Sequence, residues 1–268
     1  GGAGLGVLTF RYLIEVIRSL MLEDLMGTIG QWGGWTLALV PILGGAIVGL
    51  IRWMFQEFSP GISSLIAAVQ AGKESSPIRS IAKTIAAAVS LGSGASLGPE
   101  GPSVEVGANF GMWVGQWLRV SRERQRLLLG AGAAAGLAAG FNAPIAGVFF
   151  ALEVVLGTTF ETSAASVVLL SAVVSALIAQ IGLGSQPAFN LPVYEVRSPL
   201  ELPLYLGLGL FACLVSIAYT ELLKWSREFF NGEIPGFAWL NQIPREIQPI
   251  LGGLCVGLVA LKLPQILG

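Results

Sequence analysis

The stretch SLGSGASLGPEGPSVEVGANFG, residues 90–111, decides the fold because it interrupts one apolar segment and begins another. Glycines and serines end the first segment, and two prolines then bracket Glu100 and Gly101. Proline suits the first turn of a helix, where its missing N–H would have no partner in any case. We therefore predict a helix over 100–117 whose free amides, those of Glu100, Gly101 and Ser103, form the positive end of its dipole and can hold an anion.

The chain around this break is built for a bilayer. Of its 268 residues, 54% are hydrophobic and only 12% are charged, and the mean hydropathy is +0.74. Soluble domains carry about twice that charged fraction. Apolar runs near the bilayer-spanning length of about 20 residues recur along the sequence. No lone N-terminal apolar run precedes a polar domain, which excludes the signal-peptide pattern. We expect a multi-pass integral membrane protein.

The apolar runs and their breaks predict an all-α fold. The 36 glycines and 14 prolines gather inside apolar stretches, which is typical of helices broken within the membrane. Several expected helices are too short to cross hydrocarbon, and we interpret 61–72, 100–117 and 144–156 as half-helices or re-entrant elements. The full set of expected helices is 3–21, 36–56, 61–72, 78–93, 100–117, 124–140, 144–156, 163–182, 202–230 and 249–262.

An internal repeat indicates how these helices are organised. PILGGAIVGLI begins at Pro41 and PILGGLCVGLV at Pro249, an offset of 249 − 41 = 208, with eight of the eleven positions identical. Such duplication is typical of transporters with inverted repeats. We assign 1–200 to a first transmembrane repeat and 201–268 to the start of a second. Because only 268 − 208 = 60 residues of a second copy are present, we expect the chain to be a fragment, truncated in its second repeat.

Composition also excludes several classes of protein. The net charge is −1 and there is no long basic face, which argues against nucleic-acid binding. The absence of histidine removes His-ligated metals and Ser-His nucleophiles, so we expect no metal, no cofactor and no enzymatic activity. Cys213 and Cys255 lie in apolar segments and are interpreted as small buried hydrophobes.

Basic residues lie between the apolar segments in two places, and we interpret both groups as solvated membrane anchors, the first on the cytoplasmic side. The first group is Arg119, Arg122, Arg124 and Arg126, and the second is Lys73, Arg79 and Lys83.

Glu100 is the residue in the broken segment that carries chemistry. A carboxylate within a membrane is costly and is a functional-site hypothesis by default. At a helix N-terminus its oxygens can occupy the place of an anion and later leave it, which makes a movable gate. The alternative is a static helix cap, and the residues alone leave both open. Glu105, five residues later, is interpreted as a structural hydrogen-bonding carboxylate on another face of the helix.

GPEGPSVEVGANFG (98–111) and AAAGLAAGFNAPIAGVFFALEVV (133–155) resemble the CLC family of chloride channels and proton-coupled exchangers. The resemblance covers nearly the whole chain. It implies an inverted-repeat fold with broken helices, chloride transport, and a homodimer in the intact protein with one pore per subunit. It also places the family's gating glutamate at Glu100. The anion would be held by Glu100 and Gly101 together with the loop at 60–62.

Two positions depart from the family pattern. Pro60 stands where the family's anion-binding loop has a serine, which removes a hydroxyl and an N–H donor. The amides of Gly61 and Ile62 are still expected to face the ion. Plant nitrate-transporting members also carry proline there, so nitrate tolerance is a hypothesis, and loop drift without changed selectivity is the alternative. At Val154 the exchangers carry a proton-passing glutamate, so the valine favours passive conduction over proton-coupled exchange.

Neighbouring Glu153 does not replace that glutamate, because adjacent residues on an α-helix point about 100° apart. We expect Glu153 to face a neighbouring helix or the cytoplasmic end. Two rival functions remain weaker. A cation-coupled transporter would use Glu100, Glu105 and Glu153 as ligands, and an intramembrane enzyme would use Ser93, for which the segment supplies no activating base.

Overall fold

The computed structural model describes residues 1–29, 33–55, 61–71, 76–157, 162–184, 198, 201–234, 236–237, 239 and 242–267. In this part of the chain every regular element is helical. The chain divides into two compact units, Gly1–Ala188 with Pro249–Gly268, and Phe189–Gln248. Pro60 lies outside the described residues.

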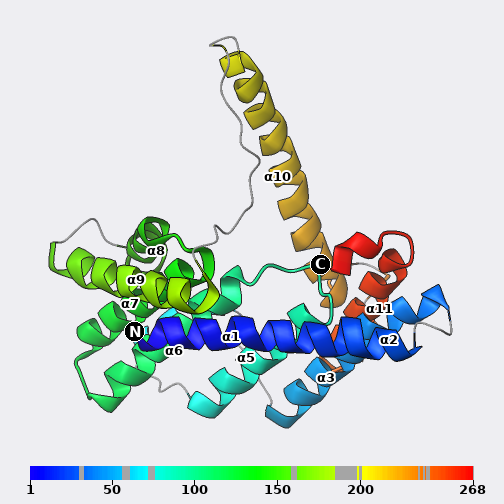
Figure 1. Ribbon diagram of the computed structural model, residues 1–268, viewed down its shortest axis with the longest axis horizontal. Coiled ribbons are helices and arrows are strands. Elements are labelled where there is room, and N and C mark those ends of the chain that lie inside the picture. Colours follow the sequence, from blue (N-terminus) through cyan, green and yellow to red (C-terminus); the bar gives the residue numbers. More distant parts are fainter. Residues whose placement is uncertain are drawn as a thin grey trace. The chain divides into compact units, whose positions relative to one another are not determined.

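The helices agree closely with those expected from the apolar runs (Figure 1). Among the described residues, three helices are long and apolar enough to cross a membrane: Gly34–Phe55, Ala164–Leu183 and Leu202–Phe230. The first unit contains α1 (Gly2–Arg18), α2 (Leu25–Ile29), α3 (Leu39–Phe55), α4 (Gly61–Gln70), α5 (Pro77–Gly92), α6 (Glu100–Trp117), α7 (Arg122–Phe141), α8 (Pro144–Phe150), α9 (Thr162–Leu183) and α11 (Gln248–Ala260). The second contains α10 (Leu202–Phe230).

The first helix is longer than expected. Its predicted end was residue 21, but α1 passes through the π-helical turn Ser19–Asp24 into α2. The stretch from Tyr12 to Met26 contains neither glycine nor proline, so nothing in the sequence breaks the backbone at residue 21.

Helix α7 is the core of the first unit. It contacts α1, α4, α6, α8 and α9, and α1 also lies across α5 and α6 (Figure 1). Its run GAGAAAGLAAG is almost wholly buried because small side chains let neighbouring backbones approach closely. A Cβ placed on Gly107 of α6 would collide with the Gly132 carbonyl of α7, and a Cβ on Gly132 would collide with the Gly107 carbonyl. The two backbones therefore touch at this pair of glycines.

The predicted repeat reappears as a reciprocal contact between α3 and α11. A Cβ on Gly45 would collide with the carbonyl oxygen of Pro249, and a Cβ on Gly253 would collide with the carbonyl oxygen of Pro41. Each glycine lies four residues after the proline of its own copy, so equivalent residues exchange equivalent contacts. A two-fold relation between the copies produces this arrangement. The repeat boundary at 200/201 stays a prediction.

Cys213 and Cys255 are both exposed, so the prediction that they are buried is wrong. The physical reason is the solvent. A lipid-facing surface is as apolar as a protein core, so an apolar segment places small hydrophobes on either side without penalty. The same argument covers α10, which has no buried residue among those described.

Candidate functional site

The expected helix over 100–117 is present with those bounds, and Glu100 is its first residue. Pro99 is the N-cap residue, with φ −75° and ψ 2°, and an aperiodic run from Gly94 leads into it. Glu100 and Gly101 are both exposed on the first turn. The glutamate therefore sits at the positive end of an 18-residue helix, where a carboxylate or a free anion is favoured.

One expected donor is already used. The Ser103 amide donates a hydrogen bond to the Pro99 carbonyl, with an N···O distance of 2.9 Å, so the prediction that this amide is free is wrong. The N-cap carbonyl accepts the first intrahelical bond, and Ser103 stands four residues after it. Pro102 has no N–H, so the amides of Glu100 and Gly101 are the ones that can face an anion.

Gly98 makes room for the Glu100 side chain. A Cβ built on Gly98 would collide with both carboxylate oxygens and the carboxyl carbon of Glu100, which means that the carboxylate folds back over the backbone of Gly98. The glycine two residues before the glutamate thus has a packing reason. It allows the carboxylate to lie against the chain at the start of α6.

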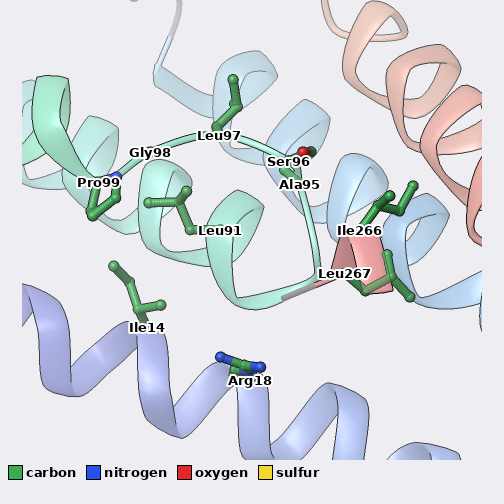
Figure 2. Close-up of a pocket in the computed structure, with 10 residues that line it drawn as sticks. All are labelled: Ile14, Arg18, Leu91, Ala95, Ser96, Leu97, Gly98, Pro99, Ile266 and Leu267. Carbon is green, nitrogen blue, oxygen red and sulfur yellow. The ribbon is translucent and has the colours of Figure 1, made fainter. Parts of the chain in front are cut away.

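A cavity of about 490 Å³ adjoins this segment (Figure 2). Residues 95–99 line one side of it, and Ile14 and Arg18 of α1 line another. Leu91 of α5 and Leu267 complete the wall. Arg18 places a guanidinium group in the wall of this cavity, close to the loop that leads to Glu100.

The second expected anion-binding element is α4. It begins at Gly61, whose φ of +70° is in the left-handed region that favours glycine. Gly61 and Ile62 occupy its first turn, so their amides lie at the positive helix end as expected. The expected contribution of Pro60 falls outside the described residues.

Glu105 connects α4 to α6. Its Oε1 lies 4.0 Å from the position that a Cβ on Gly61 would occupy. Five residues of α-helix advance about 7.5 Å, so the start of α4 lies roughly one and a half turns along α6 from Glu100. The two helix ends that the sequence assigns to anion binding therefore belong to adjacent, contacting helices.

The other oxygen of Glu105 binds Lys83 of α5, with an Nζ–Oε2 distance of 2.7 Å. The side chains are 27% and 14% exposed for Lys83 and Glu105. Interpreting Lys83 as a solvated anchor was therefore wrong. Nothing in the sequence signals this pair directly, because 22 positions separate the two residues and only the packing of α5 on α6 brings them together.

The FNAP segment forms the sharp turn between α7 and α8. Asn142 ends α7 in the left-handed conformation, with φ 53°, and α8 begins at Pro144. Gln180 of α9 donates a hydrogen bond from Nε2 to Asn142 Oδ1 at 2.6 Å. Asparagine tolerates this conformation better than most residues, and the amide of Gln180 fixes its side chain.

Val154 and Glu153 lie on the continuation of α8, which is a π-helical turn over Ala151–Leu156. Both residues are exposed, and Val154 is 52% exposed. Glu153 was expected to face either a neighbouring helix or the cytoplasmic end. Because the residue is exposed, the first of these two expectations is wrong. A π-helix rotates by less per residue than the roughly 100° of an α-helix. The adjacent side chains of Glu153 and Val154 therefore lie closer to the same face than expected.

The expectation that Arg126 is a solvated membrane anchor is wrong. Its Nη2 donates a hydrogen bond to the Leu156 carbonyl across 30 residues of sequence. Leu156 ends the π-helical turn, and Gly157 follows with φ +59°. A cation at a helix C-terminus is favoured by the dipole, so Arg126 caps the helix that follows FNAP.

The two rival functions find little support in the described residues. No group of three or more Asp, Glu, Cys or His side chains that could hold a metal ion occurs there, so Glu100, Glu105 and Glu153 do not assemble a cation site. Ser93 is 2% exposed and donates its hydroxyl to the Ser90 carbonyl at 3.1 Å.

The fold is that of a multi-pass membrane protein with broken helices. Residues 37–268 match the family model described as voltage gated chloride channel. The chain belongs to this CLC family, which consists of transport proteins and not of enzymes.

Chloride channel protein CLC-e of Arabidopsis thaliana is 36% identical over 98% of the chain and 38% of its own length. The H(+)/Cl(−) exchange transporter ClcA of Vibrio cholerae is 32% identical over 66% of the chain and 38% of its own length. The crystal structure of a slow cyanobacterial Cl−/H+ antiporter matches with a TM-score of 0.75 at 23% identity, covering 97% of the chain and 61% of the antiporter. The chain thus spans less than two thirds of these relatives.

Proposed function

We propose that the chain forms part of a transmembrane chloride pathway gated by Glu100. Membership of the voltage gated chloride channel family supports chloride as the ion. The observation that carries the gate is the position of Glu100 as the first residue of α6, with its carboxylate folded over Gly98. There the carboxylate competes with an anion for the amides of Glu100 and Gly101, and its departure or protonation vacates them.

The anion is bound weakly in this proposal, as conduction requires. Helix dipoles and main-chain amides supply the attraction, at α6 through Glu100 and Gly101 and at the start of α4 through Gly61 and Ile62. Pro60 offers no N–H, so fewer donors than in a serine-containing loop face the ion there. Planar nitrate is accordingly the second anion to test.

Passive conduction is the form of transport that we favour. Val154 holds the position of the proton-passing glutamate, and a valine neither binds nor releases a proton. The alternative is proton-coupled exchange, for which the names of two similar proteins, the V. cholerae exchange transporter and the cyanobacterial antiporter, are the specific support.

The proposal extends to the assembly. The repeats at 1–200 and 201–268 would be inverted copies, and the intact protein would be a homodimer in lipid with one pore in each subunit. The reciprocal glycine contacts of α3 and α11 support the repeat.

Reversal potentials of the full-length protein in planar bilayers test the proposal. Under a chloride gradient the potential should follow chloride, should ignore a sodium gradient, and should not shift when a pH gradient is added. A shift with pH would favour exchange. A potential that follows sodium, or an absence of any chloride current, would refute the chloride pathway.

A further inference from the structure

The carboxylate of Glu105 lies between a helix end and a lysine. Oε1 faces the first residue of α4, 4.0 Å from the Cβ position of Gly61, and Oε2 binds Lys83 Nζ at 2.7 Å. One oxygen thus lies near the first residue of α4, and the other binds the cation of α5. A carboxylate at a helix N-terminus occupies the kind of place that suits a small anion.

A second polar contact holds this arrangement in register. Ser80 Oγ donates to Asn109 Oδ1 at 3.0 Å, and Asn109 Nδ2 donates to the Glu105 carbonyl at 2.9 Å. Ser80 and Lys83 lie one turn apart on α5, and Glu105 and Asn109 lie one turn apart on α6. The Ser80–Asn109 bond therefore joins α5 to α6, the two helices from which Lys83 and Glu105 project.

The charges of the pair cancel beside the expected anion site. The Glu105 side chain is only 14% exposed, so solvent screens it less than it screens a surface ion pair. Removing Glu105 would take away the carboxylate 2.7 Å from Lys83 Nζ and make the net charge near the start of α4 more positive by one unit. Without Lys83, Glu105 would place an uncompensated negative charge on the helix end where the anion is expected to bind.

We propose that Glu105 sets the affinity of this pathway for its anion, by neutralising Lys83 and by competing for the positive end of α4. The inference rests on the proposed chloride pathway and deepens it. Glu105 is an affinity-determining residue in this account, and Glu100 remains the gate. The carboxylate keeps chloride binding weak, which favours rapid release.

Charge-removing single variants and their combination test the proposal in the full-length protein. Chloride affinity is measured by isothermal titration calorimetry and from the chloride dependence of liposome flux. A unit charge about 6 Å from the anion, at an effective dielectric constant of about 40, changes affinity about tenfold. Glu105→Gln should therefore bind chloride about tenfold more tightly and Lys83→Met about tenfold more weakly. The double variant should return to within about threefold of wild type.

A pair with a purely structural role would behave differently. Both single variants would then lower stability, and their chloride affinities would not change in opposite directions. Glu123→Gln is the matched control, because this carboxylate is exposed on α7 away from Gly61, and its affinity should equal that of wild type. Equal affinities in wild type, Glu105→Gln and Lys83→Met would overturn the inference. If wild type itself neither binds nor conducts chloride, the proposed function fails instead, so the two failures are distinguishable.

Discussion

The contact between α3 and α11 yields the most quantitative prediction. A Cβ added at Gly253 would lie 2.8 Å from the Pro41 carbonyl carbon and 3.1 Å from Ile42 Cα, and closer still to the Pro41 oxygen. All three are backbone atoms, so no rotamer change relieves the collision. Gly253→Ala must instead push α3 away by about 1 Å to reach ordinary van der Waals separation.

The cost follows from overpacking. A forced shift of this kind costs about 1–3 kcal/mol, while replacing a helical glycine by alanine returns up to about 1 kcal/mol. Gly252→Ala is the matched control, because a Cβ there meets nothing within 4 Å and only the favourable part remains. The helix-propensity gain is common to both variants, so they should differ by the overpacking cost alone, about 1–3 kcal/mol in the free energy of unfolding. At about 2–4 °C per kcal/mol, Gly253→Ala should melt about 2–12 °C below Gly252→Ala.

The repeat symmetry adds a second requirement. Gly45→Ala should destabilise as much as Gly253→Ala, since its Cβ would lie 2.8 Å from the Pro249 carbonyl carbon and 3.0 Å from Ile250 Cα. The double variant should cost less than the sum, because one displacement of α3 accommodates both methyl groups. The stability of all four variants is measured by heating the full-length protein in detergent and recording, by size-exclusion chromatography, how much folded protein remains at each temperature. If Gly253→Ala melts with Gly252→Ala, the reasoning is refuted.

Three further perturbations test the site. Gly98→Ala should displace the Glu100 carboxylate and raise chloride flux severalfold, with little loss of stability because the colliding atoms are the end of a flexible side chain. Gly207→Ala, where a Cβ meets nothing within 4 Å, is the control. Equal chloride fluxes in the two variants would contradict the packing argument. Arg126→Met should lower stability by about 1.5–3 kcal/mol through loss of the charged hydrogen bond to the Leu156 carbonyl. Arg124 is exposed, so Arg124→Met should leave stability unchanged. Equal melting temperatures of the two variants would count against the helix cap. Gln180→Leu should lower the free energy of unfolding by about 1–3 kcal/mol, because it leaves Asn142 Oδ1 unpaired. Adding Asn142→Gly removes that oxygen and keeps the left-handed conformation, so the double variant should recover part of the lost stability. No recovery would argue against the hydrogen bond.

Much of the fold is predictable from the sequence because its signals are local. Proline and glycine interrupt the apolar runs where the backbone turns, which places the starts of α6 at Glu100 and α8 at Pro144 within a residue. The repeat of PILGG predicts that α3 and α11 are equivalent, and the reciprocal contacts of Gly45 and Gly253 follow from it.

What the sequence did not predict depends on contacts between distant segments. Lys83 meets Glu105, and Arg126 reaches Leu156, only after helices pack, and each of these residues taken alone reads as an ordinary polar side chain. Cys213 was misjudged for another reason, since apolar character in a membrane chain does not distinguish a buried residue from a lipid-facing one.

Chloride flux through Glu100→Gln tests the central claim most directly. The full-length wild type and this variant are reconstituted in liposomes, and chloride efflux is measured at acidic and neutral pH. Glutamine keeps the size of the side chain but cannot carry the charge that competes with the anion. The variant should conduct faster than wild type at neutral pH, and its flux should no longer change with pH. Unchanged flux together with an unchanged pH dependence would contradict the assignment of Glu100 as the gate.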